Sequence, residues 1–251
     1  MAVPPADVGV LGGSGLYEFL DDVTEVTVET PYGAPSAPLH YGSIGGRTVV
    51  FLARHGRHHE FPAHRVNFRA NVWAMQQAGV RALFGPCSAG SLRPEIAPGH
   101  FVVIDQFVDR TSGRADTFFD GPGPQHTSMA HPYDQRLRSI LVQACREQDV
   151  VTHPTGTVVV ISGPRFSTTA ESRWFSQMGW SVVNMTNYPE AALAVEAGIP
   201  YASVALVTDY DAGLEDDPAV EPVTQEQVFA FFRQNIASVR GALFRAIEML
   251  D

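Results

Sequence analysis

Short β-rich runs alternate along this chain with segments of helical periodicity, and this alternation limits the possible folds more than any other feature. The β-rich runs are typical of strands in a buried sheet and cover residues 8–11, 47–53, 80–85, 101–105, 157–161, 180–184 and 201–207. Apolar residues at helical spacing cover residues 64–77, 134–148, 168–178, 189–197 and 224–247. The alternation predicts an α/β fold.

Local signals predict where some helices begin and where ligands bind. Thr168 and Glu171 have the spacing of a capping box, and Pro189 suits the first position of a helix. The Gly- and Pro-rich stretches 109–133 and 212–223 are expected to be long loops, which are often functional. Because α/β sheets bind ligands beyond the carboxyl ends of their strands, functional residues are expected directly after each strand.

Length and composition indicate one domain. With 251 residues, 45% of them hydrophobic and 18% charged, the chain can bury one sizeable core, so a single domain over residues 1–251 is expected. Its two cysteines fit no metal-ligand spacing, and no apolar run approaches the roughly 20 residues of a membrane span. The opening residues also lack the basic and apolar regions of a secretion signal. We therefore expect a cytoplasmic protein without a bound metal.

The identity of the basic residues excludes several classes of enzyme. All 17 are arginines, because the sequence contains no lysine. The absence of lysine excludes Schiff-base and covalent pyridoxal phosphate chemistry, P-loops and protein kinases. A formal net charge of -10 argues against nucleic acid as a partner and favours a small-molecule substrate.

A glycine-rich turn, residues 12–15, follows the first predicted strand and contains Ser14. Its backbone amides and hydroxyl can approach an anion, although a simple tight turn explains the same residues. A dinucleotide-binding fingerprint needs a third glycine and a following helix, and this segment has neither. An NAD-dependent oxidoreductase is therefore an improbable alternative.

The second long strand leads into residues 51–64, which concentrate arginines and histidines. His59 begins what looks like a zinc-binding H-E-x-x-H helix, but the next histidine comes one position late and Pro62 interrupts the helix. Arg54 and His55 suit an oxyanion better, because a guanidinium can donate two parallel hydrogen bonds and an imidazole one more. A solvated surface loop is the other interpretation.

Two carboxylates, Asp209 and Asp211, follow the apolar strand predicted over residues 201–207. Residues i and i+2 of a strand share a face, so both carboxylates can point into one pocket. Two carboxylates held close cannot both ionise readily, which lets one remain a proton donor near neutral pH. A helix cap or an exposed turn is the structural alternative. A glycosidase pair usually comes from different strands.

Small, polar and aromatic residues follow other predicted strands. The candidates after the strands ending at 161 and 184 are Phe166, Ser167, Met185 and Thr186. Aromatic rings and thioethers at such positions can contact a flat ligand, although they are more often core residues. Residues 85–92 are predicted to form a turn of small residues, and Ser88 in it lacks the G-x-S-x-G elbow of a serine nucleophile.

A set of segments, taken in chain order, points to one family. The segments are GVLGGSGLYEF, LARHGRHH, VNFRANVWAM, GSLRPEIAPG, VVIDQFVDRT, GPRFST, VVNMTNYPEAALAVEAGIPYAS and TDYD. Over residues 8–211 the chain resembles the trimeric purine nucleoside phosphorylase family, and within it the 5′-methylthioadenosine phosphorylase branch. The resemblance implies one α/β domain with a central mixed, strongly curved sheet flanked by helices. It also implies a homotrimer that cleaves the ribose–purine bond with inorganic phosphate as co-substrate and no cofactor.

The resemblance also implies a role for individual residues. The phosphate site would comprise Ser14, Arg54, His55, Cys87, Ser88 and Thr186. The nucleoside would meet Met185 under the ribose, Phe166 against the purine, and Ser167, Thr208, Asp209 and Asp211 along the base edge. His59 would line the 5′ pocket with His126 from a neighbouring subunit. Asp209 would be the general acid toward the purine N7, with Asp211 helping to set its protonation.

The base edge favours adenine. Relatives that act on 6-oxopurines carry Glu and Asn where this chain has Ser167 and Asp209. An ionised carboxylate accepts a hydrogen bond from a 6-amino group and repels a 6-oxo group.

Some positions depart from the family pattern. Cys87 and Ser88 stand where Thr-Ala is usual, and Asn187 with Tyr188 is unusual. The alternatives are a phosphorylase of inosine or methylthioinosine, a nucleosidase that uses water, and a nucleoside-binding protein without activity. Phosphate dependence and substrate comparison distinguish them.

Overall fold

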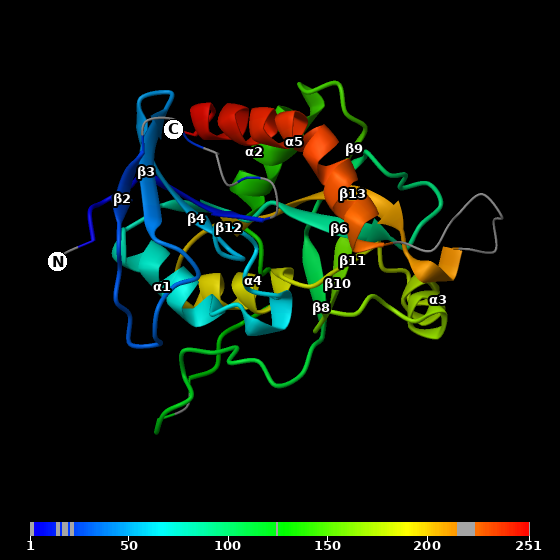
Figure 1. The fold of residues 1–251 in the computed structure, drawn as a ribbon, viewed down its shortest axis with the longest axis horizontal. Coiled ribbons are helices and arrows are strands. Elements are labelled where there is room, and N and C mark those ends of the chain that lie inside the picture. Colours follow the sequence, from blue (N-terminus) through cyan, green and yellow to red (C-terminus); the bar gives the residue numbers. More distant parts are fainter. Residues whose placement is uncertain are drawn as a thin grey trace.

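Two hydrogen-bonded sheets run side by side through the centre of the molecule (Figure 1). The computed structural model describes residues 3–13, 16, 20, 23–123, 125–214 and 224–250, apart from the side chains at 225, 227 and 232. The first sheet has the order β12 (Tyr201–Ala202), β5 (Ala82–Phe84), β1 (Val8–Gly12), β4 (Arg47–Ala53), β3 (Leu39–Ile44), β2 (Thr24–Val26). The second has the order β8 (Gln106–Arg110), β10 (Thr157–Ile161), β11 (Val182–Asn184), β6 (Cys87–Ser91), β13 (Val204–Tyr210), β7 (Phe101–Val103), β9 (Thr152–His153). Both sheets contain parallel and antiparallel neighbours, which confirms the predicted mixed α/β architecture.

The chain passes from one sheet into the other at two adjacent corners. β5 leads into β6 across Gly85 and Pro86, and β12 leads into β13 across Ser203. Gly85 is required at its corner, because a Cβ there would lie 2.0 Å from the Tyr201 hydroxyl oxygen and 2.6 Å from Glu190 Oε1. The strand predicted over 201–207 is therefore divided between two sheets.

The small-residue turn predicted over 85–92 is wrong. This segment contains β6, which pairs with β13 on one side and β11 on the other. Small residues suit β6 because side chains of the neighbouring strands approach its backbone closely. A Cβ at Gly90 would lie 3.0 Å from Asp209 Oδ2.

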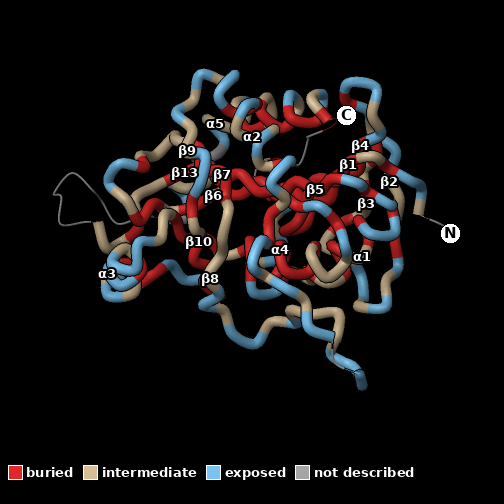
Figure 2. The backbone as a smooth tube through the Cα atoms, turned by 180° about the vertical axis from the view of Figure 1, so that it is seen from behind, coloured by how far each residue is buried: buried red, intermediate tan, exposed pale blue. Residues whose placement is uncertain are grey.

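Helices cover both faces of the sheets (Figures 1 and 2). Their bounds are α1 (Phe68–Gln77), α2 (Gln135–Arg146), α3 (Thr169–Gln177), α4 (Asn187–Glu196) and α5 (Gln225–Glu248). On β1, Val8 and Val10 belong to the buried cluster that includes residues of α2 and α5, whereas Leu11 belongs to the cluster of α1 and α4. Alternation along the strand thus supplies both cores. No helix within the described ranges has the length and apolar character needed to cross a membrane.

Helix boundaries follow the local signals only in part. Thr168 and Glu171 form the predicted capping box, with both reciprocal hydrogen bonds present. The regular part of α4 begins at Pro189, because Tyr188 before it has non-helical backbone angles. The helix predicted from residue 64 starts later. Residues Ala63–Arg65 form a 3-10 turn, and α1 begins at Phe68 with Asn67 as its cap.

An extended segment without helix or strand connects β8 to α2 and projects away from the body below α4 in Figure 1. We call residues 111–123 and 125–133 the arm. The arm makes up most of the long loop predicted over 109–133, although β8 extends to Arg110. Of the second predicted loop, Ala212–Leu214 form a 3-10 turn, and residues 215–223 lie outside the described part of the chain.

Candidate active site

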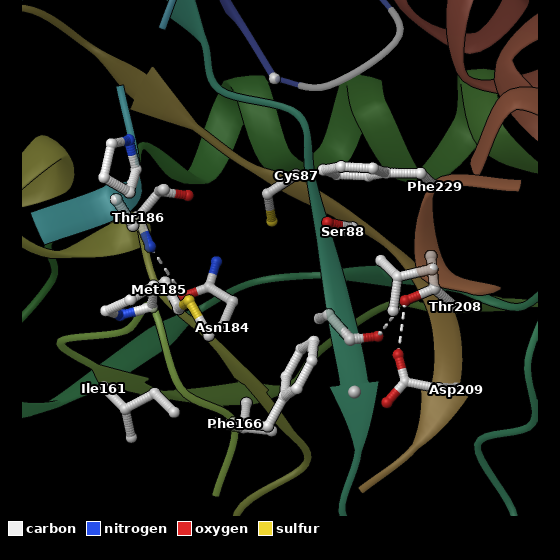
Figure 3. Close-up of a pocket in the computed structure, with 18 of the residues that line it drawn as sticks. Cys87, Ser88, Ile161, Phe166, Asn184, Met185, Thr186, Thr208, Asp209 and Phe229 are labelled. Carbon is white, nitrogen blue, oxygen red and sulfur yellow. Dashed lines mark hydrogen bonds between the residues drawn. The ribbon is translucent and has the colours of Figure 1, made fainter. Parts of the chain in front are cut away.

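A cavity of about 320 Å³ opens where the two sheets meet (Figure 3). Its walls come from the residues that follow β1, β4, β10 and β11, from β6 and the end of β13, and from the first turn of α5. The polar lining residues are Arg54, His55, His59, Cys87, Ser88, Ser167, Asn184, Thr186, Thr208, Asp209 and Asp211. Strand ends of both sheets therefore meet at one site, as expected for an α/β fold.

The cavity gathers nearly all of the residues singled out in the sequence. Phe166 and Met185 line it together with the polar residues just named. Ser14 lies outside the described residues. His126 is exposed on the arm and is not part of the cavity lining.

Arg54 lies buried just after β4 and is tied to a carboxylate that sequence reasoning missed. Its Nε and Nη2 donate to the two oxygens of Glu190 at 2.6 and 2.8 Å, and Nη2 also donates to the carbonyl of Leu11 at 2.7 Å. Burial opposes the charge, but the Glu190 carboxylate overcomes this and raises the pKa of Arg54. The expected bidentate contact of Arg54 with a bound anion is therefore wrong, because its Nε and Nη2 already donate to Glu190.

One donor of Arg54 still reaches the cavity. Nη1 donates to the carbonyl of Pro86 at 3.2 Å, and its second N–H has no acceptor among the described residues. A Cβ at Gly13 would lie 3.1 Å from Nη1, so the missing side chain keeps this nitrogen accessible. Arg54 thus offers the cavity a fixed positive charge and one N–H.

His55 faces the cavity in its neutral form. Burial, together with the neighbouring Arg54 charge, lowers the pKa of His55 to about 3. Its Nδ1 lies 2.8 Å from the carbonyl oxygen of Phe61, which can only accept, so Nδ1 carries the proton. Nε2 is then a hydrogen-bond acceptor, which corrects the expectation that His55 is a further donor.

The thiol of Cys87 and the hydroxyl of Ser88 have different surroundings, although the residues are adjacent. Cys87 Sγ accepts from Asn187 Nδ2 at 3.3 Å and lies 3.8 Å from Ser203 Oγ. Burial raises the pKa of the Cys87 thiol, so it stays protonated. Ser88 lines the cavity beside Cys87, as does Thr186, whose side chain makes no capping bond at the start of α4.

Thr208 and Asp209 line the opposite wall, across from Asn184 and Thr186 in Figure 3, and Asp211 also lines the cavity. Thr208 Oγ1 donates to Asp209 Oδ1 at 2.6 Å. Burial raises the pKa of Asp209 to about 6, with Asp211 contributing in the same direction and the Thr208 hydroxyl opposing it. This value makes Asp209 a proton donor or acceptor near neutral pH.

Asp211 lines the cavity, and one of its oxygens has no hydrogen-bond partner among the described residues. Burial raises its pKa, and the nearby hydroxyls of Ser172 and Ser167 offset this in part. Neither hydroxyl reaches full hydrogen-bond geometry, and Asp211 Oδ2, Ser167 Oγ and Asn184 Nδ2 are buried without a partner among the described residues. Buried polar atoms are usually paired, so these three cavity-lining residues mark the place of a polar ligand.

The remaining walls are aromatic or apolar. Phe166 is 36% exposed and lines the cavity beside Met185 and Ile161 (Figure 3). His59 stacks on the ring of His55 at 4.6 Å between centroids and meets Phe229 of α5 edge to face at 5.0 Å. Sequence reasoning missed Phe229, because its helical spacing is also that of a packing helix.

Comparison with known proteins decides the family. A family model described as the phosphorylase superfamily matches residues 7–248. The chain belongs to the phosphorylase superfamily. The alignments between this chain and curated members of the superfamily cover almost the whole length of both proteins. An S-methyl-5′-thioadenosine phosphorylase of Mycolicibacterium smegmatis is 51% identical over 97% of this chain and 91% of its own length.

Two further members of the superfamily show which of its enzymes this chain is similar to. A purine nucleoside phosphorylase of Streptomyces coelicolor is 50% identical over 98% of this chain and 89% of its own length. The solved structure of methylthioadenosine phosphorylase from Schistosoma mansoni with adenine has a TM-score of 0.91 and 39% identity, and covers 96% of this chain and 91% of that chain. These matches confirm the phosphorylase fold and the family resemblance seen in the sequence.

Proposed function

We propose that this protein cleaves 5′-methylthioadenosine with inorganic phosphate to give adenine and 5-methylthioribose 1-phosphate. The observation that supports this most directly is the division of one cavity into an anion-binding wall and a wall of carboxylates. The methylthioadenosine phosphorylases among the relatives support the same substrate. A cavity with polar groups on two walls suits a ligand with two polar ends, such as a nucleoside beside a phosphate.

On the anion side, phosphate accepts hydrogen bonds from Arg54 Nη1, Ser88 and Thr186. The fixed charge of Arg54 attracts the dianion, and its ion pair with Glu190 keeps the guanidinium from turning away. His55 Nε2 accepts a hydrogen bond from the protonated oxygen of the phosphate, which keeps its proton. A phosphate oxygen then forms the new bond to ribose C1′.

On the base side, the bond between C1′ and N9 breaks, and its electron pair passes to the purine. Asp209 donates a proton to N7, so adenine leaves as a neutral base. Asp211 Oδ2, which has no partner among the described residues, accepts from the 6-amino group. This polarity favours adenine over 6-oxopurines, whose oxygen would meet the carboxylate.

The 5′ end of the nucleoside is proposed to lie against His59 and α5. Val228 and Phe229 of α5 line the cavity near His59. A thioether gains from contact with an aromatic ring, whereas a hydroxyl would have to find a new partner there. The apolar wall therefore favours a 5′-methylthio group over a 5′-hydroxyl.

The proposal extends to assembly and location. We infer a homotrimer in which His126, exposed on the projecting arm, reaches the 5′ pocket of a neighbouring subunit. The described chemistry needs neither a metal nor an organic cofactor. Both cysteines are free and buried, which supports work in the reducing cytoplasm.

Release of adenine from 5′-methylthioadenosine, measured with and without phosphate, tests the proposed function. Adenine should appear only with phosphate, together with one equivalent of 5-methylthioribose 1-phosphate. Release without phosphate would indicate a nucleosidase, and cleavage of inosine or methylthioinosine in preference would indicate the 6-oxopurine alternative. Binding without release of any base would overturn the enzymatic assignment.

A further inference from the structure

Within the described part of the chain, the hydrogen bonds that Arg114 on the arm donates all go to backbone carbonyl groups. Its Nη2 donates to the carbonyls of Met185 at 2.8 Å, Ser162 at 3.1 Å and Ile161 at 3.4 Å. Its Nη1 donates to the carbonyl of Tyr188. One guanidinium therefore joins the ends of β10 and β11 to the start of α4.

The guanidinium also contacts an aromatic ring. Its central carbon lies 5.3 Å from the ring centroid of Phe68 on α1, and its Nε has no partner among the described residues. Burial lowers the pKa of Arg114 to about 10, and the charge of Asp109 acts in the opposite direction. The side chain thus stays charged at neutral pH.

The joined segments are the ones that carry the cavity's ribose and phosphate walls. Met185 lies between Asn184 and Thr186, and all three line the cavity (Figure 3). Ile161 lines it as well and begins the segment that leads to Phe166. The carbonyl groups of Ile161, Ser162 and Met185 all accept from the one nitrogen, and without this shared donor their partial negative charges would repel one another.

Other contacts hold the same part of the arm without touching the cavity. Tyr188 donates its hydroxyl proton to Asp116 at 2.6 Å, and Glu196 accepts from Thr117 Oγ1 at 2.8 Å. Arg69 Nη1 donates to Asp120 at 2.6 Å. The arm therefore remains attached at its base even when one of these contacts is lost.

We infer that Arg114 is a positioning residue, which fixes Met185 and its neighbours so that the ribose lies in line with the bound phosphate. This inference rests on the proposed function. An arginine is needed because its planar group supplies several donors in fixed directions, whereas lysine has three donors on one nitrogen and loses its proton more readily when buried.

Three variants test the inference. In Arg114→Ala, kcat/KM for methylthioadenosine should fall about 100-fold, since a shift of about 1 Å in a positioned substrate costs this much. Most of the loss should appear in kcat rather than in the KM for phosphate. Methylguanidinium should restore part of the activity by filling the vacated space. Arg114→Lys should lose about tenfold, and Arg69→Ala, the matched control on the same arm, should stay within about twofold and show no rescue.

Hydrogen exchange gives a second measurement that needs no substrate. Amides over residues 161–167 and 184–188 should exchange faster in Arg114→Ala and Arg114→Lys than in the parent, and unchanged in Arg69→Ala. If Arg114→Ala does not fold, Arg114→Lys decides the question alone. Parent-like kinetics, or equal losses in the Arg114 and Arg69 variants without rescue, would overturn the inference. If the parent itself has no activity, the proposed function fails, while the exchange pattern still decides the role of Arg114.

Discussion

If Asp209 is the general acid, kcat/KM should fall steeply as the pH rises above neutrality. Burial raises its pKa to about 6, so the carboxyl is protonated in about a tenth of molecules at pH 7 and about a hundredth at pH 8. If only the protonated form donates to N7, kcat/KM should fall about tenfold for each pH unit above roughly 6.5. The profile is measured as adenine release at limiting nucleoside and saturating phosphate between pH 5.5 and 8.5.

The ionisation of phosphate also changes over this range, so a control is needed. Asp209→Asn keeps an oxygen for the Thr208 hydroxyl but cannot supply the proton. Its kcat/KM should be lower by about 100-fold or more near pH 6, and its profile should reflect phosphate alone. A parent profile that stays flat to pH 8.5, or that has the same shape in Asp209→Asn, would refute the general-acid role.

Three further predictions concern the stability of the fold and the contact with phosphate. Because the pKa of Asp209 is raised from 3.8 to about 6 in the folded protein, the unfolded chain ionises first as the pH rises, and the folded state loses stability over this range. Asp209→Asn removes this cost. It should therefore raise the free energy of unfolding, measured with urea, by up to about 3 kcal/mol at pH 8 and by about half that at pH 5. An equal effect at both pH values would contradict this. Ser88→Ala should raise the KM for phosphate about tenfold or more, while Cys87→Ala should leave it within about twofold, because the Cys87 sulfur is a weak hydrogen-bonding group that already accepts from Asn187 Nδ2. Similar KM values for the two variants would show that the phosphate contact is wrongly assigned to Ser88. Glu190→Gln leaves Arg54 buried without a counter-charge and should lower the free energy of unfolding by about 3–5 kcal/mol, whereas an unchanged urea midpoint would show that the pair contributes little.

The sequence predicted the elements whose pattern is local. Apolar strands such as β10 and the capping box at Thr168 need only neighbouring residues to be recognised, and both are present in the structure. β6 was missed because its small residues resemble a turn, and its strand pairing depends on β13, far along the chain. The corner at Ser203 was missed for the same reason, since a continuous apolar run shows no break where it changes sheets.

The site was predictable where residue type and strand end coincide. Asp209 and Asp211 were found from their spacing, but a register shift between Val207 and Asp209 also brings Thr208 to the cavity, which strict alternation does not predict. Glu190 gave no signal, because its partner Arg54 lies 136 residues away in sequence. Phosphate contacts, the roles of the carboxylates and the trimer stay predictions.

The two corners at Gly85–Pro86 and Ser203 also shape how the site can change. The proposed anion contacts follow β4 and β11 or lie on β6, whereas the carboxylates come from β13 and its end, beyond the second corner. The covalent backbone at these two corners thus sets the spacing of the strands that carry the two walls. Under the proposed function, substitutions at the end of β13 would change the base preference and leave the anion wall unaltered, because the two walls lie on separate strands.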